Sequence, residues 1–135
     1  MKKEYYEVKN CKLAGTSYGE VYKKAWRIYL EEKMKSKRRV YLRSAYFNKE
    51  KIFLDIFWKH LKQKNKGDRE RRLKFYYCAL TLLKRSKNAP VIKYNQRMKF
   101  YRFYGKEMST GDKFVVQIKE STRGNKYLMS IFPEK

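Results

Sequence analysis

The spacing of the hydrophobic residues changes once along the chain, near residue 97, and this change restricts the fold more than any other feature. Before it, apolar side chains recur at helical spacing, as in helices buried on one side. After it, β-branched and aromatic residues form short runs separated by glycine-containing turns, as in strands. The sequence therefore predicts an α+β fold, with N-terminal helices packed on one face of a C-terminal antiparallel β-meander. The length of 135 residues fits a single domain, 1–135.

The first helix is expected over 17–36. The segment Ser17-Tyr18-Gly19-Glu20 is typical of a capping box, in which a hydroxyl and a carboxylate satisfy free amides at a helix start. Lysine and arginine residues at the other end suit the negative end of the helix dipole. The segment that follows, 40–47, is either a short strand or an extended connector.

Two more helices are expected before the change in spacing. Asn48 is a plausible N-cap for a helix over 49–64, which has one broad apolar face. Asp68 is the expected cap of a helix over 69–87, and Pro90 follows shortly after its end.

Three strands make up the expected meander, over 98–104, 114–119 and 127–132. Side chains alternate between the two faces of a strand. Arg102 therefore shares a face with Phe100 and Tyr104, and Gln117 shares one with Val115 and Lys119. In the last strand, the same alternation places Leu128, Ser130 and Phe132 on one side. The alternation does not reveal which face the helices cover.

The net charge is +23, from 36 Lys and Arg against 13 Asp and Glu. Self-repulsion of this size destabilises a compact state, so a polyanionic partner is the simplest explanation. Nucleic acid is the first candidate, because basic residues that neutralise phosphates release counterions. The chain also has 2 Trp, 13 Tyr and 8 Phe, whose rings can stack on unpaired bases. An anionic membrane surface would also attract this charge, but no apolar run is long enough for a membrane helix.

The two cysteines, Cys11 and Cys78, do not form a disulfide framework and lack the spacing of a metal site. With a single histidine in the chain, we expect no metal and no cofactor. We therefore expect two lone cysteines in a reducing cytoplasm, and the N-terminus has no apolar stretch typical of a signal peptide.

His60 is the only histidine and falls in the middle of the apolar face of the helix over 49–64. Imidazole exchanges protons near neutral pH, so His60 is a candidate acid or base. The alternative is a core residue with satisfied hydrogen bonds.

The segment 68–74 places three arginines in the expected first turn of a helix, where positive charge opposes the helix dipole. A phosphate bound there would reverse that argument. Local pairing of the arginines with Asp68 and Glu70 is the alternative. Arg102, between aromatic residues, would hold a phosphate or extend from the end of the sheet towards solvent. Ser130 is either an ordinary strand residue or, with a base beside it, a nucleophile, although no nucleophile-elbow pattern surrounds it.

Together, FLDIFWKHLKQK, GDRERRLKFY, KFYRFYGKE, GDKFVVQIKE and KYLMSIFP follow an order of elements that resembles the RelE/barnase-like (BECR-type) superfamily of ribonuclease toxins and phage or mobile-element nucleases. The resemblance covers about 40–133, so the expected core is 40–135 and 1–40 is an N-terminal helical extension. It implies metal-independent RNA cleavage, with His60 as the acid/base, Arg72 and Arg102 stabilising the phosphorane, and Ser130 orienting a phosphate oxygen. Further nucleic-acid contacts are expected from Arg69, Arg71, Lys74, Lys99, Lys119 and Lys126.

The expected partners are RNA, which many members of that superfamily cleave on the ribosome, and an acidic antitoxin protein. The chain departs from the compact toxin pattern in its first helix and in having no second histidine to act as a partner acid. Two interpretations therefore stay open: a ribonuclease, and a non-catalytic domain that binds RNA or DNA through its basic and aromatic side chains.

Overall fold

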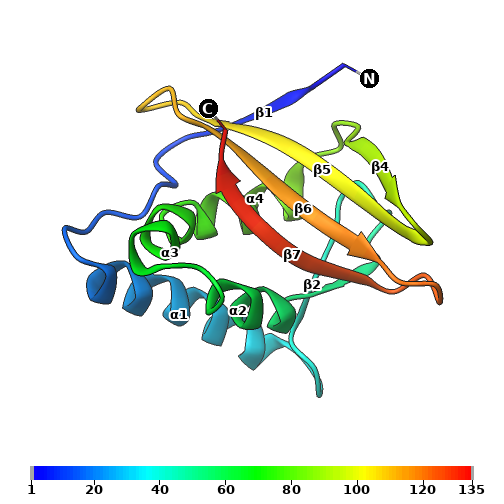
Figure 1. The fold of residues 1–135 in the computed structure, drawn as a ribbon, viewed down its shortest axis with the longest axis horizontal. Coiled ribbons are helices and arrows are strands. Elements are labelled where there is room, and N and C mark those ends of the chain that lie inside the picture. The colour runs from blue at the N-terminus through cyan, green and yellow to red at the C-terminus, as the bar shows by residue number, and fades with distance from the viewer. Residues whose placement is uncertain (1, 135) are drawn as a thin grey trace.

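The computed structural model describes residues 2–134 and has a mixed seven-stranded sheet with helices packed against it (Figure 1). The strands are β1 (Tyr5–Val8), β2 (Tyr41–Arg43), β3 (Lys51–Phe53), β4 (Val91–Asn95), β5 (Met98–Glu107), β6 (Lys113–Glu120) and β7 (Lys126–Pro133). The helices are α1 (Tyr18–Lys35), α2 (Asp55–Leu61), α3 (Lys66–Leu73) and α4 (Tyr76–Arg85).

The expected meander forms the centre of this sheet, since β5, β6 and β7 pair antiparallel in sequence order. The complete order is β1-β5-β6-β7-β3-β2, and β4 pairs with β5 beside β1. Two of these pairings are parallel, β1 with β5 and β3 with β7. The α+β class is therefore confirmed, but a simple antiparallel meander that follows N-terminal helices is wrong. Strands lie before, between and after the helices.

The first helix is confirmed as α1, and its N-cap is Ser17, whose hydroxyl accepts a hydrogen bond from the backbone N–H of Glu20. The reciprocal bond of a capping box is replaced by another contact. The Glu20 carboxylate accepts from the hydroxyl of Thr16 at 3.2 Å. The segment 40–47, for which the sequence allowed a short strand or an extended connector, contains strand β2.

The helix expected over 49–64 is shorter than predicted, because its first part is strand β3. Ile52 is fully buried between β2 and β7, and this pairing overrides the helical spacing of its neighbours. Asn48 is not a cap: its φ of 56° places it in the tight turn before β3. Helix α2 begins only at Asp55.

The helix expected over 69–87 is two helices, α3 and α4, with a break at Lys74 and Phe75. The cap of α3 is Asn65, whose side chain accepts from the N–H of Asp68 at 2.8 Å, so Asp68 lies in the first turn instead of capping it. Because α3 begins three residues earlier than expected, two of the three arginines lie near its C-terminus instead of its N-terminus. Arg71 and Arg72 occupy the last turn of α3, where the helix dipole favours positive charge. The expected conflict between the arginines and the dipole is therefore wrong.

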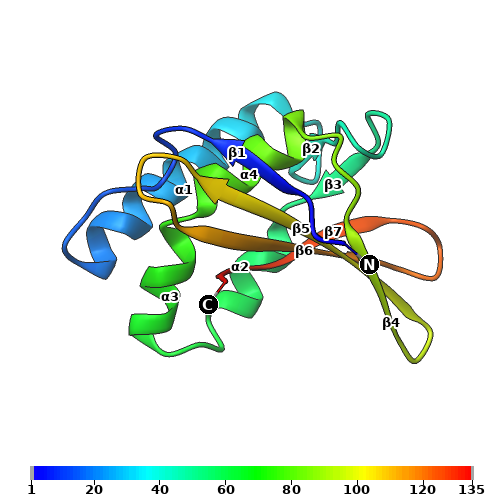
Figure 2. The same ribbon diagram turned by 90° about the horizontal axis from the view of Figure 1, so that it is seen from above.

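The helices cover one face of the meander, and the opposite face is partly open (Figures 1 and 2). Helix α4 packs on the covered face, while α2 and α3 lie along β7. Buried residues on the covered face come from every meander strand and from α4; among them are Phe103, Phe114, Val116, Ile118, Leu128, Ile131, Tyr76 and Ala79. Half-buried Arg102, Gln117 and Ser130 lie on the open face. The helices therefore cover the face opposite to these three side chains, which the alternation of side chains alone did not reveal.

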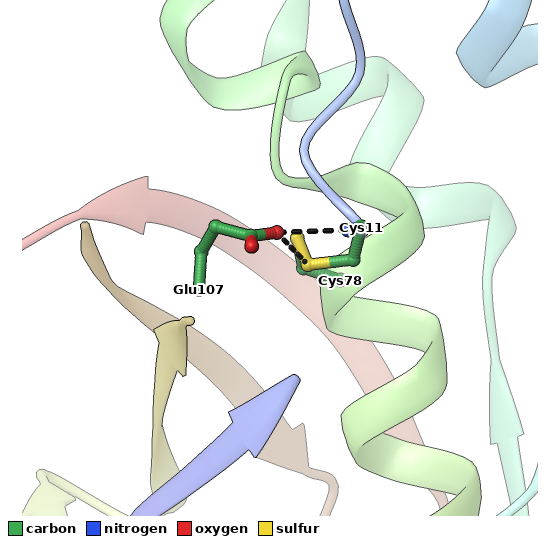
Figure 3. A group of neighbouring side chains, drawn as sticks. All are labelled: Cys11, Cys78 and Glu107. Carbon is green, nitrogen blue, oxygen red and sulfur yellow. Dashed lines mark hydrogen bonds between the residues drawn. A yellow bond between two sulfur atoms is a disulfide. The ribbon is translucent and has the colours of Figure 1, made fainter. Parts of the chain in front are cut away.

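The two cysteines are joined: Cys11, in the segment after β1, forms a disulfide with Cys78 on α4, 67 residues away in the sequence (Figure 3). The expectation of two lone cysteines is therefore wrong, because the fold brings together residues that sequence spacing does not relate. Disulfides are typical of oxidising compartments, so the cysteines do not support a cytoplasmic location. Within residues 2–134, no helix has both the length and the apolar character needed to cross a membrane.

Candidate functional site

A cleft of about 350 Å³ opens on the uncovered side of the sheet, beside the ends of α2 and α3. It is lined by His60, Lys64, Arg72, Arg102, Gln117, Met129, Ser130 and Phe132. The four residues predicted to be catalytic, which come from two helices and two strands, therefore share one cavity. Its lining carries three permanent cations and no carboxylate.

His60 reaches the cleft from the last turn of α2. Phe57 and Leu61 on the same helix are buried, and they fix α2 against β7. His60 itself is only half-buried, so it is not the core residue that the alternative interpretation described. Among residues 2–134, none hydrogen-bonds to its imidazole, and both ring nitrogens can therefore serve a ligand or a water molecule.

Arg72 is held by its neighbours in an orientation that faces the sheet. Its Nε donates to Oδ2 of Asp68 at 3.1 Å, and one terminal nitrogen donates to the carbonyl oxygen of Ile131 on β7 at 3.3 Å. A guanidinium has five N–H donors, so three remain for a ligand. The Asp68 contact confirms local pairing within α3, and the ion pair also includes Arg71.

Arg102 enters the cleft from β5. Its Nε donates to the side-chain oxygen of Gln117 on β6 at 2.9 Å, a bond that leaves the full positive charge uncompensated. The guanidinium carbons of Arg102 and Arg72 lie 6.0 and 5.7 Å from the centre of the Phe132 ring. Two cations are thus held around one ring. An anion in the cleft would be attracted by both, and guanidinium groups are well suited to hydrogen-bond the oxygens of a phosphate.

A β-bulge directs Ser130 into the cleft. Ile118 pairs with Leu128, but the preceding residue of β6, Gln117, pairs with Ser130, so Met129 is an extra residue in β7. The bulge turns two consecutive side chains, Met129 and Ser130, towards the cavity, while Leu128 faces the core. The expectation that Leu128 and Ser130 share a face is therefore wrong.

Arg69, expected to contact nucleic acid, braces the loop between α2 and α3. Its guanidinium donates to the carbonyl oxygens of Lys62 and Lys64 at 2.6 and 2.7 Å. This loop carries the Lys64 side chain that lines the cleft. In this structure, Arg69 therefore positions a cation of the cleft.

Arg71 and Lys74 line a second cavity, of about 190 Å³, on the other side of α3. Lys12 and Lys113 add positive charge to it, and Asp112 and Glu134 supply carboxylates. Arg71 is paired with Asp68 at 3.0 Å and Lys74 with Glu70 at 3.6 Å. This cavity is therefore more nearly neutral than the cleft.

The three remaining predicted lysines are separated by the sheet. Lys119 alternates with core residues of β6 and lies on the open face, next to the cleft. Lys99 has the opposite orientation, over the rings of Tyr94 and Tyr101. Lys126 is buried and paired with Glu50 at 2.8 Å and Glu120 at 3.3 Å. We leave Lys99 and Lys126 out of the candidate site.

Four lining residues were not singled out from the sequence: Lys64, Gln117, Met129 and Phe132. Phe132 carried a signal, since strand alternation already placed it on the side of Ser130, whereas the pairing of Gln117 with Arg102 appears only in the strand register. Lys64 carried none beyond its charge, because a loop has no period. Met129 reaches the cavity only through the bulge.

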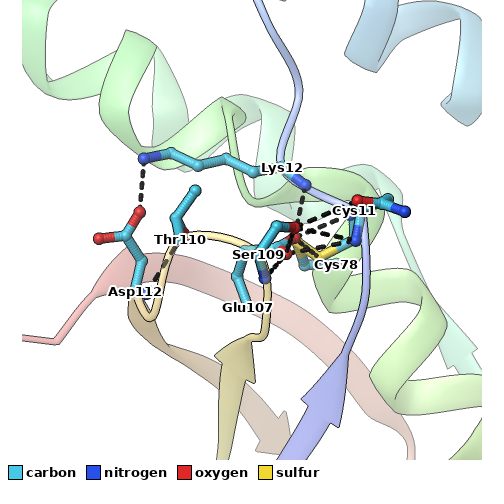
Figure 4. Close-up of a disulfide and its surroundings, with 8 residues drawn as sticks. Cys11, Lys12, Cys78, Glu107, Ser109, Thr110 and Asp112 are labelled. Carbon is cyan, nitrogen blue, oxygen red and sulfur yellow. Dashed lines mark hydrogen bonds and ion pairs between the residues drawn. A yellow bond between two sulfur atoms is a disulfide. The ribbon is translucent and has the colours of Figure 1, made fainter.

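A second polar cluster surrounds the disulfide and is closed to ligands (Figures 3 and 4). Glu107 is fully buried, and its carboxylate accepts from the backbone N–H groups of Asn10, Cys11, Lys12 and Ser109 and from the Ser109 hydroxyl. Burial alone would raise the pKa of Glu107, but these donors lower it to about 2. The carboxylate thus fastens the segment after β1 to the end of β5.

The same cluster is the group of described residues with the spacing of metal ligands, since atoms of Cys11, Cys78 and Glu107 lie within 4.8 Å of one another. Metal binding needs thiolates, and the two sulfur atoms are bonded to each other. The Glu107 oxygens are already occupied by N–H and O–H donors. In this state, the cluster offers a metal no free ligand.

The cleft, in contrast, combines a proton-exchanging imidazole, a hydroxyl and three cations around one space. These are the groups that transfer a phosphoryl group without a metal: a proton acceptor and donor, and positive charge for a developing oxyanion. No protein-family model, no curated protein and no solved structure matches this chain.

Proposed function

We propose that the protein is a metal-independent RNA endonuclease of the RelE/barnase-like type. The observation that carries this proposal is the convergence of His60, Arg72, Arg102 and Ser130, from four separate elements, on one cation-lined cleft. Among these four, His60 supplies the group that can accept and donate a proton. RNA is the proposed substrate because its 2′-hydroxyl can supply the nucleophile from within the substrate.

In the proposed reaction, His60 accepts the proton of the 2′-hydroxyl as its oxygen bonds to phosphorus. Arg72 and Arg102 donate hydrogen bonds to the non-bridging oxygens, where negative charge develops in the phosphorane. The Ser130 hydroxyl orients one of these oxygens. The bond from phosphorus to the 5′-oxygen breaks, and the imidazolium returns its proton to that oxygen. The products are a 2′,3′-cyclic phosphate and a free 5′-hydroxyl.

The proposed partners follow from the charge. RNA, including mRNA on a ribosome, would neutralise part of the +23. An inhibitory acidic protein of the antitoxin kind would do the same by covering the cleft.

A second candidate function is binding of RNA or DNA without cleavage. It is favoured by one observation: among residues 2–134, no carboxylate or carbonyl group orients the His60 imidazole. Catalytic histidines are commonly held in one tautomer by such a partner.

The test is incubation of the purified protein with a labelled single-stranded RNA in EDTA, with and without ribosomes. We expect a 2′,3′-cyclic phosphate product, which His60→Ala abolishes while RNA binding and the melting temperature stay unchanged. Lys59→Ala is the matched control, because Lys59 is the exposed neighbour of His60 on α2 and lies outside the cleft. Cleavage that survives in His60→Ala would refute the assignment. Salt-dependent binding with no cleavage under either condition would establish the second candidate.

A further inference from the structure

Another cavity, of about 220 Å³ and distinct from the one beside Arg71 and Lys74, adjoins the cleft on the open face of the sheet. It is lined by Lys93, Tyr94, Asn95, Phe100, Arg102 and Gln117. Arg102 and Gln117 line both cavities, so the two form one continuous surface across β5 and β6. The cleft therefore extends towards the hairpin of β4 and β5.

Strand register shows how this extension is built. Phe100 on β5 pairs with Lys93 on β4 and with Lys119 on β6, so an aromatic ring lies between two lysines in one row across the sheet. The next row on the same face consists of Arg102, Gln117 and Ser130. Alternate residues of a strand are about 7 Å apart, so the rows are close enough for adjoining parts of one short ligand.

The row continues to Tyr127 on β7, which pairs with Lys119, and its other three side chains have neither ring nor carboxylate partners in the described part of the chain. Among residues 2–134, no other ring packs against Phe100, and no carboxylate forms an ion pair with Lys93 or Lys119. Phe100 is half-buried, which fixes its ring against the sheet while part of the ring stays accessible. An accessible ring flanked by free ammonium groups is the arrangement by which proteins stack unpaired bases and hold the adjoining phosphates.

We infer that Phe100, Lys93 and Lys119 form a base-binding subsite for single-stranded RNA, next to the position of the cleaved phosphate. The base stacks on Phe100, and the two lysines contact phosphates on either side of that nucleotide. The inference rests on the proposed function, because Arg102 and Ser130 define the neighbouring phosphate position. It makes a substrate of several nucleotides better than a single nucleotide, and it excludes base-paired RNA from this face.

The experiment measures the affinity of the protein for two probes that it cannot cleave: a 2′-O-methyl RNA trinucleotide and a nucleoside 3′-phosphate. We expect Phe100→Ala to weaken trinucleotide binding by about tenfold to a hundredfold. Affinity for the nucleoside 3′-phosphate should not change, because its phosphate binds at Arg72 and Arg102. Phe100→Leu, which keeps an apolar side chain against the sheet, should lose the same affinity with an unchanged melting temperature.

The lysines are tested by the salt dependence of trinucleotide binding. Lys93→Ala and Lys119→Ala should each reduce the slope of log affinity against log salt by about one. The controls are Tyr77→Ala, an exposed tyrosine on α4, and Lys37→Ala, an exposed lysine after α1; both lie outside the two cavities and should bind as the wild type does.

The outcomes separate this inference from the proposed function. Wild-type trinucleotide affinity in both Phe100 variants would overturn the subsite. If Arg102→Ala still lost affinity for the nucleoside 3′-phosphate, the cleft itself would stand. A wild-type protein that bound neither probe would overturn both proposals. Equal affinity for a 2′-deoxy trinucleotide would overturn the restriction to RNA while leaving the stacking position in place.

Discussion

The polar clusters around Glu107 and around His60 differ in one respect. Around Glu107, five donors from two chain segments converge on one buried carboxylate. Around His60, three cations, an imidazole and a hydroxyl face an open cavity that no carboxylate lines, and within residues 2–134 only Arg72 of the three cations has an ion-pair partner, Asp68. The Glu107 carboxylate is hydrogen-bonded by donors from the protein itself, whereas the cleft keeps a net positive charge that the protein does not neutralise. Internal pairing is therefore complete in the cluster that holds two chain segments together and incomplete in the cluster that we propose as the binding site.

The difference also has an energetic side. Three cations held in one cleft repel one another, and this repulsion lowers the stability of the free protein. A bound anion would reduce this repulsion, as the proposed function requires. The Glu107 cluster has no such deficit, and its effects should appear in folding alone.

The largest expected effect is on the closed cluster. Glu107→Ala leaves the buried N–H of Cys11 and three partly buried N–H groups without their charged acceptor, and we expect it to lower the free energy of unfolding by about 3–5 kcal/mol. Denaturant unfolding measures this loss. Cleavage per folded molecule should not change, because Glu107 lies outside the cleft. The control is Glu31→Ala on the exposed side of α1, with an expected change within about 0.5 kcal/mol. A similarly small change for Glu107→Ala would contradict the comparison.

The next effect concerns the open cluster and has the opposite pattern. Arg102→Ala removes a donor to the developing charge, and we expect cleavage to slow by about 10²–10³-fold. Stability should fall by no more than about 1 kcal/mol, because the bond to Gln117 is a single partly exposed contact. Single-turnover cleavage and denaturant unfolding measure the two quantities. Arg123→Ala, in the exposed turn before β7, is the control. If Arg102→Ala lowered the free energy of unfolding without slowing cleavage, Arg102 would be a residue that holds the fold, as Glu107 is.

The smallest effect is a loss of stability at low pH. The pKa of Glu107 is lowered from 4.5 to about 2, so its contribution to stability is complete above pH 4.5 and is lost as the pH falls towards 2. Melting temperatures measured from pH 6 down to pH 2 should therefore fall more steeply for the wild type than for Glu107→Gln. The difference between the two curves isolates Glu107 from the other carboxylates. Parallel curves would show that Glu107 keeps an ordinary pKa.

Sequence patterns predicted the parts of the fold that are long and regular. The meander strands and α1 repeat their period often enough to be recognised, and Arg102, Gln117 and Ser130 lie on such strands. Strands β2 and β3 have three residues each, too few for any alternation, and only pairing with neighbours makes them strands. The helix boundaries failed for a related reason. Asn65 and Asp68 are both residue types that are favoured at an N-cap, and in the structure Asn65 is the cap of α3.

The site was predicted in part for the same reason. The chemistry of His60, Arg72, Arg102 and Ser130 pointed to them one by one, but their common cavity depends on the placement of α2 and α3 against β7. The bulge at Met129 and the loop position of Lys64 are products of the fold and have no local sequence signal. Pairing of Cys11 with Cys78 likewise depends on how α4 is placed beside the segment after β1.

The bond between Cys11 and Cys78 turns the first half of the chain into a closed covalent ring and leaves the remainder as a tail. His60 and Arg72 belong to the ring, whereas Arg102 and Ser130 belong to the tail. A protease that cuts one exposed peptide bond inside the ring, such as that after Lys37, would open the ring without releasing a fragment. All four of these cleft residues lie in the fragment after residue 37, so a reductant would then release only the N-terminal fragment, which carries β1 and α1.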